Sequence, residues 1–239
     1  MVKVIDDLVI LGRAAPDSMR DGRHSLCSAG YSPTIGFVRL FPTYIDTPLH
    51  RWDEVTVRVE DESGDYRLQS HKLVYSNNPA KLNENISLNR ILKRSEKIKF
   101  IESLPISSID DLGTKDKTIG LIKPQIIGVD VVPRECEDGK QLTIFGSETI
   151  KTKSDYDFMP RLKYYCTPKC GQCPHNQQLL EHGAYEFMRK NKGNEQDVLE
   201  NLRILDRNFD KWFLVGNMKH HPARFVVISV LRFKSSGSC

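Results

Sequence analysis

The chain has 239 residues, of which 39% are hydrophobic and 28% charged, a composition typical of a soluble globular protein. This length allows one large domain or two small ones. No uncharged apolar run in the sequence approaches the length of a membrane span. Asp6 and Asp7 interrupt the N-terminal apolar stretch, and no small-residue cleavage site follows it. We therefore expect a cytoplasmic protein.

The net charge is +4, and its distribution along the chain is uneven. From position 211 to the end there is no acidic residue but five basic ones, namely Lys211, Lys219, Arg224, Arg232 and Lys234. Residues 1–210 hold the other 30 basic residues and all 31 acidic ones, a net charge of −1. The basic C-terminal segment favours an anionic partner. A surface that only keeps the protein soluble is the alternative, because five charges are few.

The first 75 residues carry the pattern of short β-strands. Residues 54–60 (EVTVRVE) alternate strictly, with Val55, Val57 and Val59 on one face. We expect five strands, over residues 2–11, 24–29, 35–42, 54–60 and 66–75. Five short strands without a long helix predict a small closed barrel.

The next segment, residues 76–118, is more polar and predicts a helical connector between two lobes. Helix formers from Leu88 to Lys97 predict one helix with Ser87 as its N-cap. Residues 107–112 (SSIDDL) predict a short second helix. The predicted domains are an N-terminal barrel over residues 1–75, the connector over 76–118 and a C-terminal domain over 119–239.

The β pattern returns after residue 118. We expect strands over residues 119–122, 126–132, 142–145, 212–215 and 224–233. A turn at Gly216-Asn217 is predicted between the last two of them.

Two helices are predicted within this C-terminal part. Leu180, Ala184 and Phe187 share one helical face, which predicts a helix over residues 175–190. Asn194 is a candidate N-cap for a further helix to residue 205. The chain as a whole is thus predicted to be mostly β with helical insertions, an α+β fold.

The most specific motif is a cluster of cysteines and a histidine with the spacing C-x3-C-x2-C-x-H, made by Cys166, Cys170, Cys173 and His175. Four such donors within ten residues can close a tetrahedron around zinc. Proline and glycine residues between them favour the tight turns that this requires. Because the protein supplies all four ligands, we expect a structural zinc ion that pins a strand to the following helix.

Alternatives to this zinc site remain open. Three of the six cysteines fall within eight residues, which argues against a secreted disulfide framework, but they can also be a chance cluster of thiols. An iron–sulfur cluster uses similar spacing, although too little chain follows for the barrel that radical enzymes carry. His182 is a possible fourth ligand in place of His175. Cys27 and Cys136 are interpreted as ordinary thiols.

Basic and aromatic residues near the strands suggest a nucleic-acid surface, since aromatic rings stack on bases and basic groups hold phosphates. The candidate binding residues are Arg39, Arg51, Trp52, Trp212, Asn217, Lys219, His220 and Arg224. The competing interpretation is that Trp52 and Trp212 are core residues. The sequence contains no nucleophile motif, zinc-protease motif or phosphate-binding loop. We therefore expect a protein that is not an enzyme.

Several segments together resemble the prokaryotic dual OB-domain (DuOB) family, which is associated with conflict and phage-defence gene neighbourhoods. The matching stretches are residues 25–42 (SLCSAGYSPTIGFVRLFP), 51–59 (RWDEVTVRV), 119–124 (IGLIKP), the cysteine cluster with the segment that follows it to residue 190, and 212–217 (WFLVGN) with the last strand. They occur in order over most of the chain. The chain lacks a tryptophan that the family carries near His182-Gly183.

The resemblance implies two OB-like small β-barrels, the second carrying the zinc cluster and the helices. It also implies a non-enzymatic role in sensing nucleic acid or nucleotides, with an effector protein encoded nearby as a possible partner. From the residues and the resemblance we expect a module that binds single-stranded or modified DNA or RNA. A small-ligand sensor or protein–protein adaptor is the alternative, since OB barrels also bind other ligands. A nuclease is the least favoured alternative.

Overall fold

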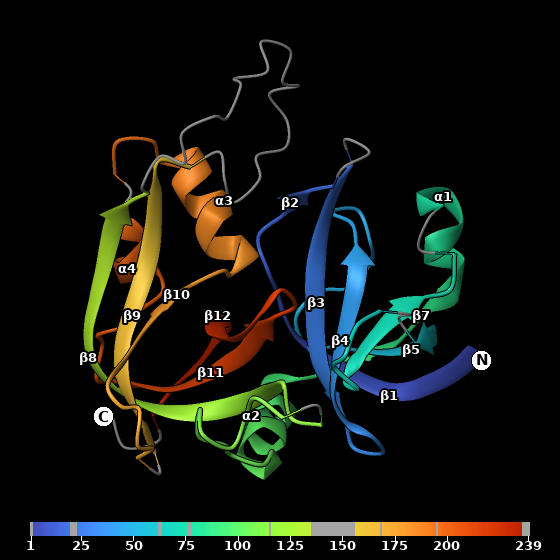
Figure 1. Cartoon of the computed structure of the whole chain (residues 1–239), viewed down its shortest axis with the longest axis horizontal. Helices are drawn as coiled ribbons and strands as arrows, with labels where there is room; N and C mark the ends of the chain where they lie inside the picture. Colours follow the sequence, from blue (N-terminus) through green and yellow to red (C-terminus); the bar gives the residue numbers. More distant parts are fainter. Residues whose placement is uncertain are drawn as a thin grey trace.

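The computed structural model of the protein describes residues 2–19, 23–61, 64–75, 78–114, 116–134, 156–167, 169–194 and 196–235. The predicted strand over residues 142–145 and Cys136 lie outside the described residues. Two lobes stand side by side, with the first half of the chain in one and the second half in the other (Figure 1). None of the helices within the described residues has the length and hydrophobicity needed to span a membrane.

The N-terminal lobe is a closed five-stranded barrel, as predicted. Its strands are β1 (Val2–Arg13), β3 (His24–Ser32), β4 (Gly36–Thr43), β5 (Asp53–Asp61) and β6 (Ser70–Leu73). They pair in the order β1-β3-β4-β6-β5, and β5 returns to β1. The β4–β6 pair is parallel and the other pairs of the barrel are antiparallel. This closed order is that of an OB-like barrel.

Alternation of side chains explains how the barrel fills its interior. Val55, Val57 and Val59 of β5 are fully buried, while the residues between them are partly or fully exposed. They join Leu8 and Leu40 in a core that belongs to this barrel. A short strand, β2 (Asp17–Ser18), pairs with the start of β3 outside the ring.

The predicted helix over residues 88–97 is wrong in its first half. Residues 86–91 form β7 (Ile86–Ile91), which pairs with β5 at the edge of the barrel sheet. Its residues are exposed apart from Ile86, so the sequence shows no alternation of apolar and polar residues that would predict a strand. The helix α2 begins later and spans Arg94–Ser103, where the Glu96 carboxylate accepts a hydrogen bond from the Lys93 N–H at 2.6 Å.

The rest of the predicted connector also differs from the expectation. A short helix α1 (Pro79–Leu82) and a 3₁₀ turn (Asn83–Asn85) precede β7. Residues 107–112 form turns rather than a helix, since the Asp111 carboxylate accepts hydrogen bonds from the Ser108 N–H and hydroxyl. Segment 76–118 thus contributes a strand to the first sheet, and the domain boundaries themselves stay a prediction.

The C-terminal lobe is a five-stranded antiparallel sheet that curls into a half-barrel. Its strands are β8 (Ile119–Pro133), β9 (Phe158–Thr167), β10 (His175–Gln178), β11 (Phe209–Met218) and β12 (His221–Lys234), in the order β10-β9-β8-β11-β12. Leu179, just after β10, forms a bridge with Val227 of β12, which brings the two ends of the sheet together. The mostly β fold with two OB-like barrels and few helices is therefore confirmed.

Strand β8 is continuous where two strands were predicted. Its first residues pair with β11 as far as Ile122, and from Lys123 onward it pairs with β9. Pro124 lies where the strand changes neighbour, so the proline does not interrupt a continuous ladder.

Two further predictions in this lobe are corrected. The predicted helix over residues 175–190 begins only at residue 182, as α3 (His182–Lys190), because residues 175–178 form β10. The later helix is α4 (Asp197–Asn201), which is shorter than predicted.

The hairpin turn lies at Lys219-His220, after β11, and not at Gly216-Asn217. Gly216 and Asn217 are paired residues of β11. A Cβ atom at position 216 would lie 2.8 Å from the Arg39 guanidinium, so that side chain would have to shift to admit any residue other than glycine. Gly216 therefore allows β11 to lie close to Arg39 of the N-terminal lobe and does not form the turn.

The two lobes meet along a seam centred on Glu181, a buried residue just before α3. One Glu181 carboxylate oxygen accepts the Val230 N–H of β12 at 2.7 Å. The other accepts an N–H of Arg51, which belongs to the N-terminal lobe, at 2.7 Å. The backbone of the same segment bonds to Ala15 and Val227, so it lies between β12 and the end of β1.

Apolar packing follows the same seam. One continuous core cluster includes Val9 and Leu11 of β1 together with Phe213 and Val230 of the C-terminal lobe. A Cβ atom on Gly12 would overlap the Ser229 side chain, so the backbone of β1 and strand β12 approach as closely as glycine allows.

We predict that Glu181→Ala destabilises the whole chain by about 2–4 kcal/mol, because it leaves the buried Val230 N–H without an acceptor and removes the carboxylate that pairs with Arg51. Urea unfolding measures this loss. Glu186→Ala is the matched control, since Glu186 pairs with Arg189 at the surface of α3 and its removal costs no more than about 1 kcal/mol. Equal losses in the two variants would contradict the role of Glu181.

Candidate metal centre and interlobe cleft

The four predicted ligands come together at the hairpin of β9 and β10. Cys166 lies near the end of β9, Cys170 and Cys173 lie in the connection, and His175 is the first residue of β10. Pairing of His175 with Tyr164 brings the two strands into register and closes the connection on itself. The sequence folds this way because strands β9 and β10 are neighbours and the short connection holds the remaining two donors.

The donor atoms of Cys166, Cys170, Cys173 and His175 all lie within 4.8 Å of one another. The His175 Nε2 is 3.3, 3.0 and 3.4 Å from the sulfurs of Cys166, Cys170 and Cys173. A tetrahedral ion with bonds of 2.0–2.3 Å would space such donors about 3.5–3.8 Å apart. Small outward movements of the side chains therefore suffice to admit a metal ion, and the cluster can hold one.

The electrostatic environment of the donors favours a cation. Burial raises the pKa of the Cys166 and Cys170 thiols, so that their thiolates need a positive charge nearby. For Cys173 burial also acts to raise the pKa, but hydrogen bonds from the Cys170 thiol and from backbone N–H groups outweigh it and lower the pKa. Burial lowers the pKa of His175, which keeps its imidazole neutral and its lone pair available.

Contacts around the cluster hold the connection in place. The Asp110 carboxylate accepts the Gly171 N–H at 2.7 Å, which ties the connection to the turn segment that precedes β8. Cys166 donates its N–H to the Cys173 sulfur at 3.2 Å. His182, the alternative fourth ligand, lies on α3 and is not among the clustered donors. The structure thus brings His175 rather than His182 to the three cysteines.

The predicted nucleic-acid-binding residues fall into three groups. Trp52 and Trp212 are buried, and both pack on Phe233 of β12, with ring centroids at 5.5 and 6.2 Å. Their surroundings are those of core residues. Arg51 is bound to Glu181 at the seam.

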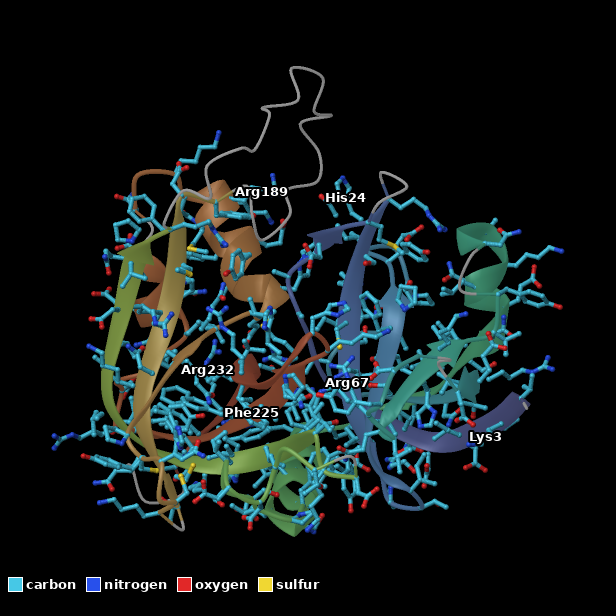
Figure 2. All side chains as sticks on the ribbon, viewed as in Figure 1. Lys3, His24, Arg67, Arg189, Phe225 and Arg232 are labelled. Carbon is cyan, nitrogen blue, oxygen red and sulfur yellow. The ribbon has the colours of Figure 1, made fainter. Side chains whose placement is uncertain are left out.

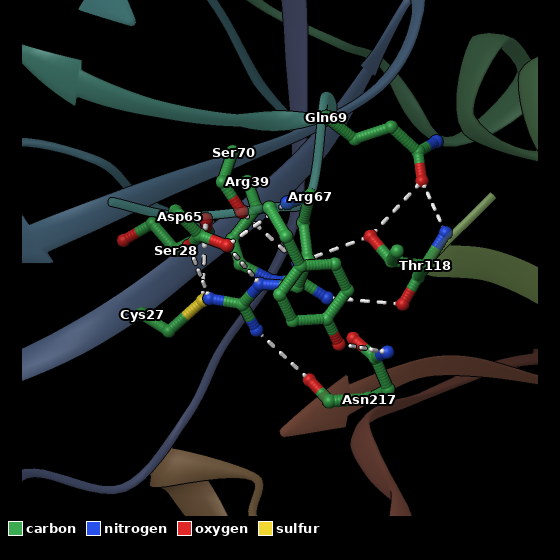
Figure 3. Close-up of polar contacts among 10 residues, drawn as sticks. Cys27, Ser28, Arg39, Asp65, Arg67, Gln69, Ser70, Thr118 and Asn217 are labelled. Atoms are coloured by element: carbon green, nitrogen blue, oxygen red, sulfur yellow. Dashed lines mark hydrogen bonds and ion pairs between the residues drawn. The ribbon is translucent and has the colours of Figure 1, made fainter. Parts of the chain in front are cut away.

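The second group is buried between the lobes. The Arg39 guanidinium donates to the Ser70 hydroxyl and to the hydroxyl and carbonyl of Thr118, at 3.1–3.3 Å. The Asn217 side chain donates to the Tyr66 hydroxyl at 2.8 Å, and its backbone carbonyl accepts an N–H of Arg67 at 3.0 Å. Figure 3 shows these groups converging from β4, the β5–β6 connection and β11.

The third group lies around the tip of the β11–β12 hairpin. His220 and Arg224 are exposed and Lys219 is partly exposed. Lys219 and His220 line the same cleft as Arg39 and Asn217, whereas Arg224 is not among its lining residues.

This interlobe cleft has a volume of about 380 Å³. Its walls come from the β1–β3 connection, β3, β4, the β5–β6 connection, the segment after β10 and the β11–β12 hairpin. The lining residues are Ala14, Ala15, Asp17, Ser25, Leu26, Cys27, Arg39, Phe41, Arg67, Leu180, Gly216, Asn217, Met218, Lys219, His220, His221, Val226 and Ile228. Arg67 marks the place where the N-terminal barrel faces the hairpin (Figure 2).

Sequence reasoning missed Arg67, Asp65 and Cys27, which surround Arg39. Asp65 holds Arg67 through two hydrogen bonds of 2.8 and 2.6 Å. Burial raises the pKa of the Cys27 thiol, an effect that Arg39 and Arg67 partly oppose. No motif spacing joins these residues, because they meet only when the barrel closes.

These features define a mostly β protein with two OB-like barrels, a Cys₃His cluster able to hold a metal ion and a cleft between its lobes. A family model described as "Domain of unknown function (DUF8758)" matches residues 5–103, from β1 to the end of α2. The match therefore covers the N-terminal barrel with β7 and α2, which is less than half of the chain. No curated protein matches the chain.

We predict that the purified protein holds about one equivalent of a metal ion, measured by inductively coupled plasma mass spectrometry after dialysis. His175→Ala should lower the metal content severalfold, because it removes one of four donors. His182→Ala is the control and should retain the metal. Loss of metal in His182→Ala with retention in His175→Ala would reverse the assignment of the fourth ligand.

Proposed function

We propose that this protein is a non-catalytic module that binds single-stranded or modified DNA or RNA. In keeping with its resemblance to the dual OB-domain family, we place it in a prokaryotic defence system, where it acts in the cytoplasm beside an effector protein. The observation that carries the proposal is the position of the cleft on the N-terminal barrel, next to the basic β11–β12 hairpin.

The position of the cleft supports this proposal through the known use of OB-like barrels. These barrels bind oligonucleotides on the face formed by their second and third strands. This face is flanked by the loop between strands one and two and the loop between strands four and five. The corresponding parts here are β3, β4, the β1–β3 connection and the β5–β6 connection. The cleft is lined by Asp17, Cys27, Arg39 and Arg67 from these four parts.

The charge of the hairpin supports a nucleic-acid partner. Lys219 and Arg224 flank its tip, and the chain has no acidic residue from position 211 onward. Phosphates of a strand that passes the mouth of the cleft would meet these side chains together with His220. Phe41 of β4 lines the cleft and is partly exposed, so it can stack against a base.

For the metal cluster we propose a structural zinc ion. Three thiolates and one imidazole are a donor set that zinc prefers, and four protein ligands leave no open position for a substrate. The ion would hold the β9–β10 hairpin closed and fix Asp110 against its connection, so its binding energy would contribute to folding. The sequence predicts that the ion pins a strand to the following helix, but His175 is the first residue of strand β10.

A small-ligand or nucleotide sensor is the second candidate function. The observation that favours it is the cleft volume of about 380 Å³, which lies in the range of small-molecule sites. In this case the C-terminal lobe would close over a free ligand instead of a strand.

The proposed function predicts salt-dependent binding of single-stranded oligonucleotides. Lys219→Ala combined with Arg224→Ala should weaken binding about tenfold at low salt and flatten the dependence of log Kd on log salt by about 1.4, since two phosphate contacts are lost. Fluorescence anisotropy titrations over a series of salt concentrations measure both quantities.

Lys3→Ala combined with Arg90→Ala is the control for charge, because Lys3 lies at the far side of the N-terminal barrel (Figure 2) and Arg90 on β7. This variant should bind like the unaltered protein. If the protein binds no single-stranded DNA or RNA at low salt, the proposal is wrong.

The structural zinc ion predicts that Cys170→Ser loses the metal and destabilises the fold by more than about 3 kcal/mol. Thermal unfolding together with metal analysis measures the effect. Cys27→Ser, which lies outside the cluster, should keep both the metal and the melting temperature within a few degrees. A metal-free Cys170→Ser variant with unchanged stability would contradict the structural role.

A further inference from the structure

We infer that the interlobe cleft is a phosphate-recognition site, in which Arg39 binds the terminal phosphate monoester of a nucleotide. The inference rests on the proposed function and adds to it the chemical group that is recognised. The phosphate can belong to the end of a strand or to a free mononucleotide, and the experiment below separates these two sources.

The first observation is a buried cation, Arg39, that pairs with no carboxylate among the residues that the structure describes. Arg39 is 2% exposed, and its guanidinium donates to the neutral oxygens of Ser70 and Thr118 and lies against the Cys27 thiol. Burial lowers the pKa of Arg39 to about 10, so the group stays charged at neutral pH. Asp65, an acid that interacts electrostatically with Arg39, is engaged by Arg67 through two hydrogen bonds.

Such a charge is costly for the fold unless an anion compensates it. A guanidinium presents five N–H donors in one plane, which matches the oxygens of a phosphate. The bonds to Ser70 and Thr118 hold the Arg39 side chain at the cleft. A phosphate monoester is therefore the ligand group that this arrangement fits.

The second observation is the presence of buried polar atoms that lack partners in the walls of the same cleft. Within the described part of the chain, the Ser25 hydroxyl and the side-chain amide oxygen (Oδ1) of Asn217 are buried without a hydrogen bond. Ser25 can donate to a phosphate oxygen, and Asn217 can accept from a sugar hydroxyl or a base. Buried polar groups are normally satisfied, so both atoms point to a ligand that completes them.

The remaining walls suit the other parts of a nucleotide. Phe41 offers an aromatic ring for a base, and aliphatic side chains such as Leu26 and Ile228 line the cleft beside it. Lys219 and His220 at the rim add positive charge near the entrance, while Asp17 is the one carboxylate among the lining residues described. A volume of about 380 Å³ lies in the range of sites that hold a single small molecule, such as one nucleotide.

The test compares ligands with and without a terminal phosphate. Isothermal titration uses the four ribonucleoside 5′-monophosphates against the four nucleosides, and one single-stranded oligonucleotide as its 5′-phosphate, 3′-phosphate and unphosphorylated forms. We expect at least one phosphorylated form to bind about tenfold or more tightly than its unphosphorylated counterpart. Equal affinities throughout would overturn the inference.

Arg39→Met should abolish this preference while keeping the chain folded, because an apolar side chain carries no desolvation cost and the Thr118 carbonyl still accepts the Asn217 N–H. Arg39→Lys should retain part of the preference. A full preference in Arg39→Met would overturn the inference.

A second variant keeps the test decisive if Arg39→Met does not fold. Lys219→Ala, at the rim, should reduce the phosphate preference severalfold. The control Lys234→Ala removes the same charge at the other end of β12 and should leave the preference unchanged. If Lys219→Ala and Lys234→Ala show the same preference for phosphorylated ligands, the phosphate does not bind in the cleft and the inference is overturned.

The outcomes also separate this inference from the proposed function. Salt-dependent strand binding without any phosphate preference would leave the proposed function standing and overturn the inference. Binding of monophosphates that depends on Arg39, without binding of any strand, would support the phosphate site and replace the proposed function by the nucleotide sensor.

Discussion

The relative position of the two barrels depends on the contacts of the Glu181 carboxylate. It joins a backbone N–H of β12 to Arg51 of the N-terminal lobe, and the backbone on either side of it bonds to both lobes. Because an acid buried at 4% exposure is tolerated only when its oxygens are bound, this contact selects one arrangement of the lobes. The close approach of Gly12 to β12 is possible only in that arrangement.

Fixing the lobes in this way places a second set of polar groups opposite one another. Arg39 and Arg67 from the first barrel meet Thr118 and Asn217 from the second lobe (Figure 3). Arg39, Arg67 and Asn217 also line the cleft. Asp65 compensates Arg67, but no carboxylate among the described residues pairs with Arg39. Proteins keep such costly groups mainly where function requires them, at the expense of stability. The metal cluster lies on a different hairpin and lines no part of the cleft, which suits a structural role.

The sequence predicted the strands of the first barrel because their side chains alternate, as Val55, Val57 and Val59 do, and it predicted the metal cluster because its four donors are neighbours in the chain. It could not predict β7, because the residues of this strand are mostly exposed and show no alternation of apolar and polar side chains. It also could not predict the strand that begins at His175, because that strand depends on pairing with β9. From the sequence, Trp52 and Trp212 can be either base-stacking or core residues. Their packing on Phe233 in the structure identifies them as core residues. Arg67 and Asp65 lie in a connection whose role depends on the opposite lobe. Contacts between distant segments thus account for most of what the sequence left open.

The central claim is that ligand binds between the lobes and touches both. Amide hydrogen exchange of the full chain, measured by mass spectrometry with and without a 5′-phosphorylated oligonucleotide, tests this most directly. The account predicts slower exchange in two segments at once, residues 64–69 of the first barrel and residues 216–221 of the β11–β12 hairpin, with no change in α2. Slower exchange confined to one lobe, or centred on the β9–β10 connection, would contradict it.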